Sequence, residues 1–277
     1  MDFSVPRIAL ADGTSIDVLG YGVYKVPPED TARLCSIALD AGYRLLDTAA
    51  LYANEAGVGR AARSFLDTAD RSELFITSKV WNDDHGYDAT LRAFDTSMDL
   101  LGIDRLDLYL IHWPCPGKDQ YVESWRAMIR LRDEGRVRSI GVSNFQQPHL
   151  QRLLDETGVV PVLNQVELHP YLQQRELRAF HGRHRISTQA WSPLGRGNVL
   201  SDPVVGRIAA AIGRTPAQVI LRWHLHLGIL TIPKASSRDR IASNLDIFGF
   251  ELDDAHLDEL AALDRNQRFG SHPDRVG

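Results

Sequence analysis

Four polar side chains in the first half of the sequence have types that could together move a proton. Each lies at or just after the end of a short apolar run: Asp47, Tyr52, Lys79 and His112. Taken singly, they have ordinary structural interpretations as a helix cap, a half-buried ring, an edge cation and a buried histidine. A carboxylate, a phenol, an ammonium and an imidazole that converge on neighbouring strand ends are instead typical of an acid–base site.

Eight short apolar runs predict the strands that must position these groups. They are Leu19–Val23, Arg44–Asp47, Leu74–Val80, Leu106–His112, Val137–Val142, Val162–Glu167, Ile186–Trp191 and Ile229–Ile232. Each gap can hold one helix and two loops, which predicts an α/β fold, a (β/α)8 or TIM barrel with its active site at the carboxyl ends of the strands. The length of 277 residues is close to the roughly 250 of one such barrel, so we expect a single domain over residues 1–277.

A β-hairpin is expected before the first strand, because Ile8–Leu10 and Ser15–Val18 flank an Asp-Gly turn signal at residues 12–13. This hairpin could close the bottom of the barrel, and an extra helix is expected near the C-terminus. A doubly wound dinucleotide-binding fold is the alternative architecture. It has little support, because the Gly-x-Gly runs at residues 20–22 and 195–197 both lack the third glycine of the GxGxxG motif.

Two helices carry clear terminal signals. After the first run, apolar residues recur at helical spacing and stop before Gly42, which can cap the helix: Leu34, Ile37, Ala38 and Ala41. The segment Thr215–Gln218 combines an N-cap threonine, a proline at the first helical position and a capping-box glutamine.

The composition excludes several classes of protein. Thirty-one basic and thirty-six acidic side chains give a net charge of −5 without a basic cluster, which argues against nucleic acid or an anionic membrane as a partner. The longest stretch without a charged residue, Ser139–Gln151, has 13 residues, whereas a membrane span needs about 20 apolar ones. Met1–Ser4 do not begin a secretion signal, so we expect a cytoplasmic protein. Cys35 and Cys115 form no CxxC or zinc pattern, and no metal is expected.

Three separated motifs resemble the signatures of the aldo-keto reductases. They are Gly42–Ala49 continuing through Tyr52 to Glu55–Gly59, then Arg138–Phe145, and finally Ile232–Lys234 with Arg240 and Asn244. Asn164–Pro170 and the tail Ser271–Asp274 extend the likeness over nearly the whole chain. The tail and Ala190–Leu194 are most similar to the bacterial 2,5-diketo-gluconate reductase branch of that family.

The resemblance implies NAD(P)H-dependent carbonyl reduction without a metal, with Asp47, Tyr52, Lys79 and His112 as the catalytic set. Hydride addition to a carbonyl leaves an alkoxide that must be protonated, and a phenol with a pKa near ~10 is a reluctant donor. An ammonium about 4 Å from the phenolate contributes roughly 4 kcal/mol at an effective dielectric near 20, equivalent to about three pKa units. We therefore expect Lys79, held protonated by Asp47, to bring the pKa of Tyr52 toward neutrality. His112 would donate a hydrogen bond to the carbonyl oxygen.

The same resemblance implies which residues hold the cofactor. Three of them match the group that binds the nicotinamide carboxamide, and one matches the ring on which nicotinamide stacks: Ser143, Asn144 and Gln165, and Trp191. The run Leu194–Gly197 would lie beside the pyrophosphate, where Gly195 and Gly197 allow close backbone approach, and Ser192 is a further expected cofactor residue. The remaining four would contact the adenosine phosphate end: Lys234, Ala235, Arg240 and Asn244.

NADPH is the expected cofactor, with NADH used more weakly. NADPH-preferring relatives follow Ile-Pro-Lys with serine and place an arginine two residues further on, whereas this chain has Ala235 and Ser237. Lys234 and Arg240 remain to bind the 2′-phosphate. The preference should therefore be smaller than in those relatives.

Three aromatic residues just beyond strand ends would wall a pocket for the substrate: Tyr24, Trp81 and Trp113. The expected partner is a small carbonyl compound, such as a keto-sugar acid or a dicarbonyl. The family is commonly monomeric, so a monomer is expected.

Two other functions remain open. A Schiff-base lyase would use Lys79 as its nucleophile, although Asp47 would favour the protonated amine. A regulatory cofactor-binding subunit would keep the barrel without significant turnover, which the intact set of four residues disfavours. Family members that reduce steroid double bonds carry glutamate at the histidine position, so His112 favours carbonyl chemistry.

Overall fold

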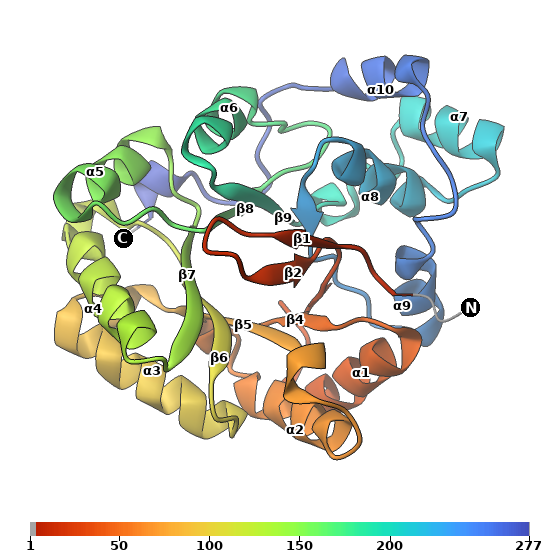
Figure 1. Cartoon of the computed structure of the whole chain (residues 1–277). Helices are drawn as coiled ribbons and strands as arrows, with labels where there is room; N and C mark the ends of the chain where they lie inside the picture. Colours follow the sequence, from red (N-terminus) through yellow and green to blue (C-terminus); the bar gives the residue numbers. More distant parts are fainter. Residues whose placement is uncertain (1–3, 277) are drawn as a thin grey trace.

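The centre of the molecule is a parallel eight-stranded sheet that curls into a barrel (Figure 1). The computed structural model describes residues 4–276, so Met1–Phe3, which were considered for a secretion signal, lie outside it. The strands neighbour one another in chain order: β3 (Tyr21–Gly22), β4 (Leu45–Asp47), β5 (Phe75–Val80), β6 (Leu106–Ile111), β7 (Val137–Ser143), β8 (Leu163–Glu167), β9 (Ser187–Trp191) and β10 (Leu230–Thr231). The predicted (β/α)8 barrel is confirmed.

The barrel closes through a short seam between its first and last strands. The N–H of Gly20 donates to the carbonyl of Thr231 at 2.8 Å, and the N–H of Thr231 donates to the carbonyl of Val18 at 3.0 Å. With a third bond, from the Gly22 N–H to the Pro233 carbonyl at 3.3 Å, the seam remains short. The first and last strands are therefore shorter than the apolar runs at residues 19–23 and 229–232 had predicted.

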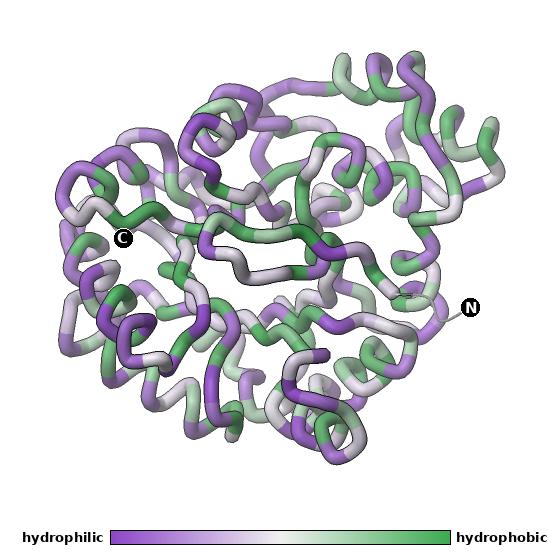
Figure 2. The backbone as a smooth tube through the Cα atoms, in the orientation of Figure 1, coloured by the Kyte–Doolittle hydropathy of each residue, from purple (hydrophilic) through white to green (hydrophobic). Residues whose placement is uncertain are grey.

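Helices surround the barrel (Figure 1). They are α1 (Pro28–Ala41), α2 (Glu55–Leu66), α3 (Tyr87–Leu101), α4 (Tyr121–Asp133), α5 (Gln147–Thr157), α6 (Arg175–His184), α7 (Pro203–Ile212), α8 (Pro216–His226), α9 (Arg238–Leu245) and α10 (Asp254–Ala261). Hydrophobic and hydrophilic stretches alternate along this outer ring (Figure 2), as in helices with one face on the strands. The expected extra C-terminal helix is α10. Within residues 4–276, no helix has the length and apolarity needed to cross a membrane.

The predicted hairpin is also confirmed, and it lies across one end of the barrel (Figure 1). It consists of β1 (Arg7–Ala9) and β2 (Ser15–Asp17). Its turn is attached to β7, because the Ser139 hydroxyl donates to Asp12 Oδ2 at 2.7 Å. Leu10 and Ile16 join the apolar side chains that fill the barrel interior. This end of the barrel is therefore packed, and the carboxyl end of the strands remains for a site.

Both predicted helix signals are present. Gly42 follows α1 with φ 113°, a conformation that glycine adopts without strain. At the start of α8, the Gln218 N–H donates to the Thr215 hydroxyl at 3.2 Å, and the Thr215 N–H donates to Gln218 Oε1 at 3.0 Å. This reciprocal pair is the capping box that the sequence predicted.

The variant Thr215→Ala should lower the free energy of unfolding by about 1 kcal/mol, because it leaves the Gln218 N–H without its cap. Urea unfolding followed by circular dichroism measures the change. Thr96→Ala, the same substitution at an exposed position inside α3, is the matched control and should change stability by less than about 0.5 kcal/mol. Equal changes in the two variants would show that the cap contributes nothing.

Candidate active site

The strands point alternate side chains into the barrel, and this period positions the predicted catalytic groups. Lower in the barrel, the interior is filled by Leu45, Phe75, Leu108, Leu110 and Leu163. Two or four residues further along the same strands come the polar groups of the carboxyl end: Asp47, Lys79, His112 and Gln165. The same alternation that packs the core therefore brings these groups together at the mouth of the barrel.

Lys79 and Asp47 form a buried ion pair. Lys79 Nζ lies 2.6 Å from Asp47 Oδ1 and also donates to the carbonyl of Thr48 at 2.9 Å. Burial lowers the pKa of Lys79, and the Asp47 carboxylate opposes that shift. A buried ammonium needs such a partner, because desolvation of an unpaired charge is costly. The pair holds the Lys79 ammonium in a fixed position below the mouth of the barrel.

Tyr52 lies in the short helix η1 (Ala50–Tyr52) beside this pair. Lys79 Nζ is 5.1 Å from the centre of the Tyr52 ring. Burial raises the pKa of Tyr52 well above its usual value, and the Asp47 carboxylate raises it further. The expectation that Lys79 brings this pKa toward neutrality is therefore wrong, because desolvation of the phenolate dominates and Lys79 directs its hydrogen bonds to Asp47 and Thr48. At neutral pH Tyr52 keeps its proton, as a proton donor must.

His112 packs a neutral imidazole against the Tyr52 ring. The two ring centres are 5.6 Å apart in an edge-on arrangement. Burial lowers the pKa of His112 well below its usual value, and the Lys79 charge lowers it further. A neutral imidazole has one N–H to donate. Trp81 packs edge-on against the same ring at 5.2 Å, and Asn144 Nδ2 donates to the His112 backbone carbonyl at 2.9 Å.

Gln165 connects the ion pair to the far wall of the barrel. Its Nε2 donates to Asp47 Oδ2 at 2.7 Å and to Gln189 Oε1 at 2.8 Å. Both oxygens of Asp47 therefore carry a hydrogen bond. Gln189 was not among the predicted site residues, although its place two residues before Trp191 on a predicted strand puts it on the same face.

Ser143, Asn144 and Trp191 form a hydrogen-bonded chain along the neighbouring strand ends. The Ser143 hydroxyl donates to the Gln165 carbonyl at 2.8 Å, and Trp191 Nε1 donates to Asn144 Oδ1 at 2.8 Å. Asn144 has φ 66°, in the left-handed region that asparagine tolerates better than most residues. These bonds fix the orientation of the Trp191 indole.

Most of the predicted catalytic, cofactor and substrate residues lie around one cavity of about 140 Å³. It is lined by eleven of them: Tyr24, Asp47, Tyr52, His112, Trp113, Ser143, Asn144, Gln165, Trp191, Ser192 and Lys234. Arg196, from the run predicted to lie beside the pyrophosphate, also lines it, together with four residues that were not predicted: Gly22, Leu51, Pro193 and Ile232. Lys79 contacts the cavity only through its partners, because its own side chain is fully buried.

The remaining predicted cofactor residues are not among those that line this cavity. They lie on two segments, one around η5 and one from β10 through α9. Leu194, Gly195 and Gly197 belong to or adjoin the turn η5 (Gly195–Gly197), directly after Trp191. Gly195 has φ 57°, and a Cβ there would lie 2.4 Å from Val199 Cγ2. Both facts require glycine at this position.

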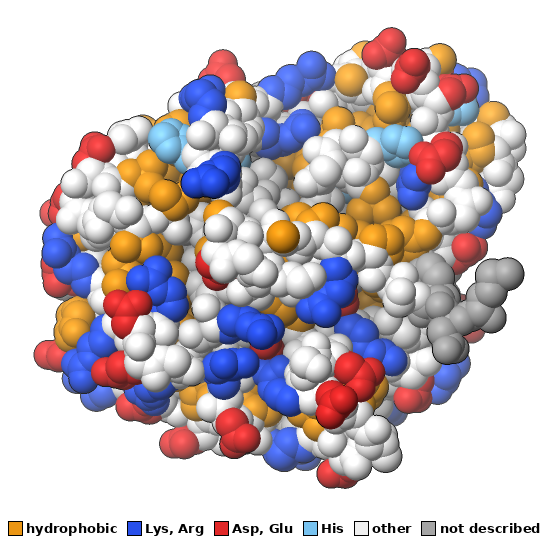
Figure 3. All heavy atoms as spheres, viewed as in Figure 1, with side chains coloured by type: hydrophobic (Ala, Val, Ile, Leu, Met, Phe, Trp, Pro, Cys, Tyr) orange, Lys and Arg blue, Asp and Glu red, His pale blue; other side chains and the backbone are white. Residues whose placement is uncertain are grey.

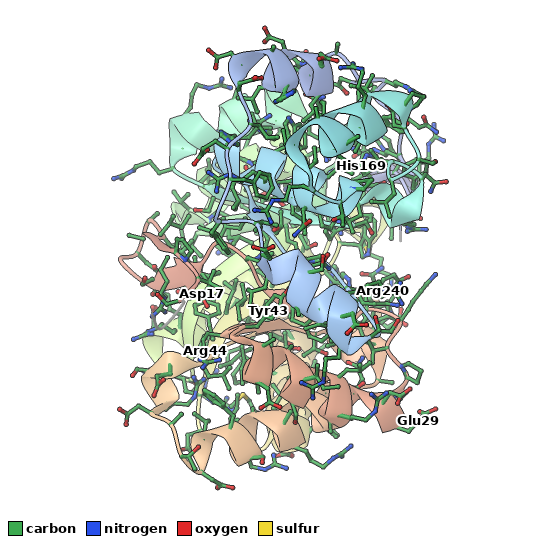
Figure 4. All side chains as sticks on the ribbon, turned by 90° about the vertical axis from the view of Figure 1, so that its right-hand side faces the viewer. Asp17, Glu29, Tyr43, Arg44, His169 and Arg240 are labelled. Carbon is green, nitrogen blue, oxygen red and sulfur yellow. The ribbon has the colours of Figure 1, made fainter. Side chains whose placement is uncertain are left out.

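The second segment runs from β10 through α9: its loop carries Ala235, and α9 carries Arg240 and Asn244. The Tyr21 hydroxyl donates to the Ala235 carbonyl at 2.6 Å, which ties the loop to β3. Arg240 projects from α9 (Figure 4), and its Nε donates to the Ser237 hydroxyl at 3.1 Å. Asn244 is buried in the same helix.

A barrel with a buried ammonium, a protonated phenol and a neutral imidazole at its carboxyl end has the side chains of an acid–base site. Comparison with known proteins gives the family. The model of the Aldo/keto reductase family matches residues 18–265. The chain belongs to the aldo/keto reductase family, as its sequence motifs predicted, and is an oxidoreductase.

Individual relatives match over nearly their whole length. An aldo-keto reductase of Mycolicibacterium smegmatis is 52% identical over 268 residues, 97% of each chain. The methylglyoxal reductase DkgA of Escherichia coli is 48% identical over 272 residues, 98% of each chain. Among solved structures, a mutant of Gox0644 in complex with NADPH is 49% identical with a TM-score of 0.95, over 99% of this chain and all of that one.

Proposed function

We propose that the protein is an NADPH-dependent carbonyl reductase in which Tyr52 protonates the oxygen of an aldehyde or ketone. The observation that carries the proposal is the pairing of a protonated phenol with a neutral imidazole, whose ring centres are 5.6 Å apart on the wall of one cavity. The substrate class is a small dicarbonyl or keto-sugar acid. The names of the relatives, which include a methylglyoxal reductase, support this choice.

The residues around the cavity fit a nicotinamide cofactor. Arg196 and Lys234 both line it, and neither forms an ion pair with an acidic side chain in the described part of the chain. Two such cations suit a phosphate. The Trp191 indole offers a flat face beside the amides of Asn144 and Gln165. When bound, NADPH supplies the hydride.

The chain's own residues then supply the proton. As negative charge develops on the substrate oxygen, the Tyr52 hydroxyl donates its proton and the His112 N–H donates a hydrogen bond. The phenolate left behind is stabilised by the Lys79 ammonium, whose Nζ is 5.1 Å from the ring centre. Asp47 keeps Lys79 charged and oriented through their 2.6 Å contact.

This proposal has a direct test against a lyase. Absorbance at 340 nm should fall when NADPH and methylglyoxal are added together, and borohydride should trap no lysine adduct. A Schiff base would need a reachable amine, whereas the Lys79 side chain is fully buried and bonded to Asp47 and Thr48. A regulatory subunit would show cofactor binding without the fall in absorbance.

We also infer that residues 1–277 act as one cytoplasmic domain and as a monomer. The hairpin is bonded to β7 through Asp12, and the family model spans most of the chain. The net charge is −5, and basic and acidic side chains are intermingled on the face shown in Figure 3. These features favour a small-molecule partner over nucleic acid or a membrane.

Lys234→Ala should raise KM for NADPH about tenfold and KM for NADH less than twofold. Lys234, like Arg196, is an exposed cation of the cavity wall. Lys234 is the one whose sequence motif resembles the site of the 2′-phosphate, which only NADPH carries. NADPH should still be the better cofactor of the unaltered protein, by a modest margin, because Ala235 offers no hydroxyl.

Measured kcat/KM for both cofactors checks this prediction. Lys118→Ala is the matched control, since Lys118 pairs with Asp83 away from the cavity. Equal losses for NADPH and NADH in Lys234→Ala would mean that Lys234 does not contact the 2′-phosphate.

A further inference from the structure

A buried carboxylate beside the site binds the backbone of a distant segment. Glu167 ends β8 and is fully buried. Its Oε1 accepts hydrogen bonds from the Phe269 N–H at 2.6 Å and from His169 Nε2 at 3.1 Å, and its Oε2 accepts one from the Gly270 N–H at 3.0 Å. Burial alone would raise the pKa of Glu167, but these hydrogen bonds outweigh burial and hold the pKa below its usual value. Glu167 is therefore a carboxylate at neutral pH.

The segment that it binds, residues 265–270, is here called the C-terminal strap. Its amino-terminal part is tied to the loop after β8, because the N–H groups of Arg265 and Gln267 both donate to the Tyr171 carbonyl, at 3.1 and 3.0 Å. The Phe269 ring packs on His169, with ring centres 5.0 Å apart; Figure 4 labels His169. These contacts bring Phe269 and Gly270, at the end of the strap, to Glu167, which binds their N–H groups.

The strap contacts two elements that border the cavity, the Trp191 indole and the η5 turn. A Cβ at Gly270 would lie 2.5 Å from Trp191 Cη2 and 2.9 Å from Glu167 Oε2. A Cβ at Gly195 would lie 3.2 Å from Phe269 Cε2. Trp191 is also the register partner of Glu167 in the pairing of β8 with β9. The strap thus packs against the Trp191 indole and the η5 turn.

We propose that Glu167 is a positioning residue that, by holding Phe269 and Gly270, sets the depth of the Trp191 indole in the cavity and so the affinity for the nicotinamide cofactor. The inference rests on the proposed function, because it takes Trp191 as the ring on which nicotinamide stacks. Glu167 is not among the residues that line the cavity and acts only through the strap. Its loss should change cofactor binding far more than the chemical step.

Glu167→Gln keeps the shape of the side chain but replaces one acceptor oxygen with a donor, so at least one strap N–H loses its partner. Amide hydrogen exchange at Phe269 and Gly270 should become at least tenfold faster. KM for NADPH should rise about tenfold while kcat stays within about threefold. Glu176→Gln on the exposed side of α6 removes the same charge and should change neither.

Gly270→Ala tests the same contact from the other side and leaves the Glu167 side chain itself unaltered, although the new methyl group crowds both Trp191 Cη2 and Glu167 Oε2. The added methyl group must displace the Trp191 indole or the strap, so KM for NADPH should rise here as well. Gly206→Ala is the control, since a Cβ there meets nothing within 4 Å.

The outcomes separate the parts of the proposal. Unchanged exchange in Glu167→Gln would overturn the role of Glu167 in holding the strap. Faster exchange with an unchanged KM for NADPH would overturn its role in positioning Trp191. If Glu167→Gln does not fold, an unchanged KM in Gly270→Ala overturns the proposal and a raised KM supports it. Amide exchange needs no turnover, and fluorescence titration with NADPH gives the cofactor affinity without turnover. Both measurements therefore test the role of Glu167 even if Tyr52 is not the proton donor.

Discussion

Tyr52→Phe should abolish carbonyl reduction while NADPH still binds. The substitution removes the only hydroxyl that we assign to protonating the substrate, and general acid catalysis of this kind contributes about 10²- to 10⁴-fold. The aromatic contacts with Tyr24 and His112 remain, so the pocket keeps its shape. Steady-state kcat with methylglyoxal gives the effect, and fluorescence titration with NADPH gives the affinity.

The contradicting result is equally definite. If Tyr52→Phe kept more than about a tenth of kcat, a loss of only about 1.4 kcal/mol, another group would have to supply the proton. Tyr24→Phe is the matched control, because that ring lies on the same cavity wall, 5.1 Å from Tyr52. It should keep most of kcat.

Lys79→Met should lower kcat at least about 100-fold and move the alkaline limb of its pH profile upward. The reduction needs protonated Tyr52, so kcat falls as the pH rises through the pKa of Tyr52. Burial and Asp47 already raise that pKa. Removing the nearby cation leaves Asp47 unopposed and raises it further, while the phenolate that forms during the reaction loses its stabilising charge. Measurements of kcat from about pH 6 to the highest pH at which both proteins stay folded check both effects.

A double variant keeps this test independent of folding. Lys79→Met alone leaves the Asp47 carboxylate buried without its partner, which costs about 3–5 kcal/mol of stability. Asp47→Asn with Lys79→Met removes both charges and should recover much of that stability, yet it should remain inactive. High activity in the double variant would show that the ion pair serves only the fold.

The sequence carried much of the information needed for the fold. All eight strands coincide with apolar runs, because parallel strands covered by helices are buried on both faces. The period of two also placed Asp47 and Lys79 on the inward face, since each follows Leu45 or Phe75 by an even number of residues. The close approach of these side chains followed from the fold and needed no further information.

Other features depend on contacts that a linear pattern does not contain. The raised pKa of Tyr52 depends on how far burial outweighs Lys79, and on the direction in which Lys79 Nζ points. The bonds of Glu167 to Phe269 and Gly270 join residues about a hundred positions apart in the chain. None of these contacts has a local sequence signal.

The narrow seam of the barrel also has a consequence for biosynthesis. Because β3 meets β10 only through a few backbone bonds, the cylinder cannot close on the ribosome until the segment around Thr231 has emerged. Until then the nascent sheet has two open edges, one of them formed by its earliest strand. Joining ends that lie more than two hundred residues apart is a slow, non-local step. During translation these edges are the surfaces that a chaperone would have to cover.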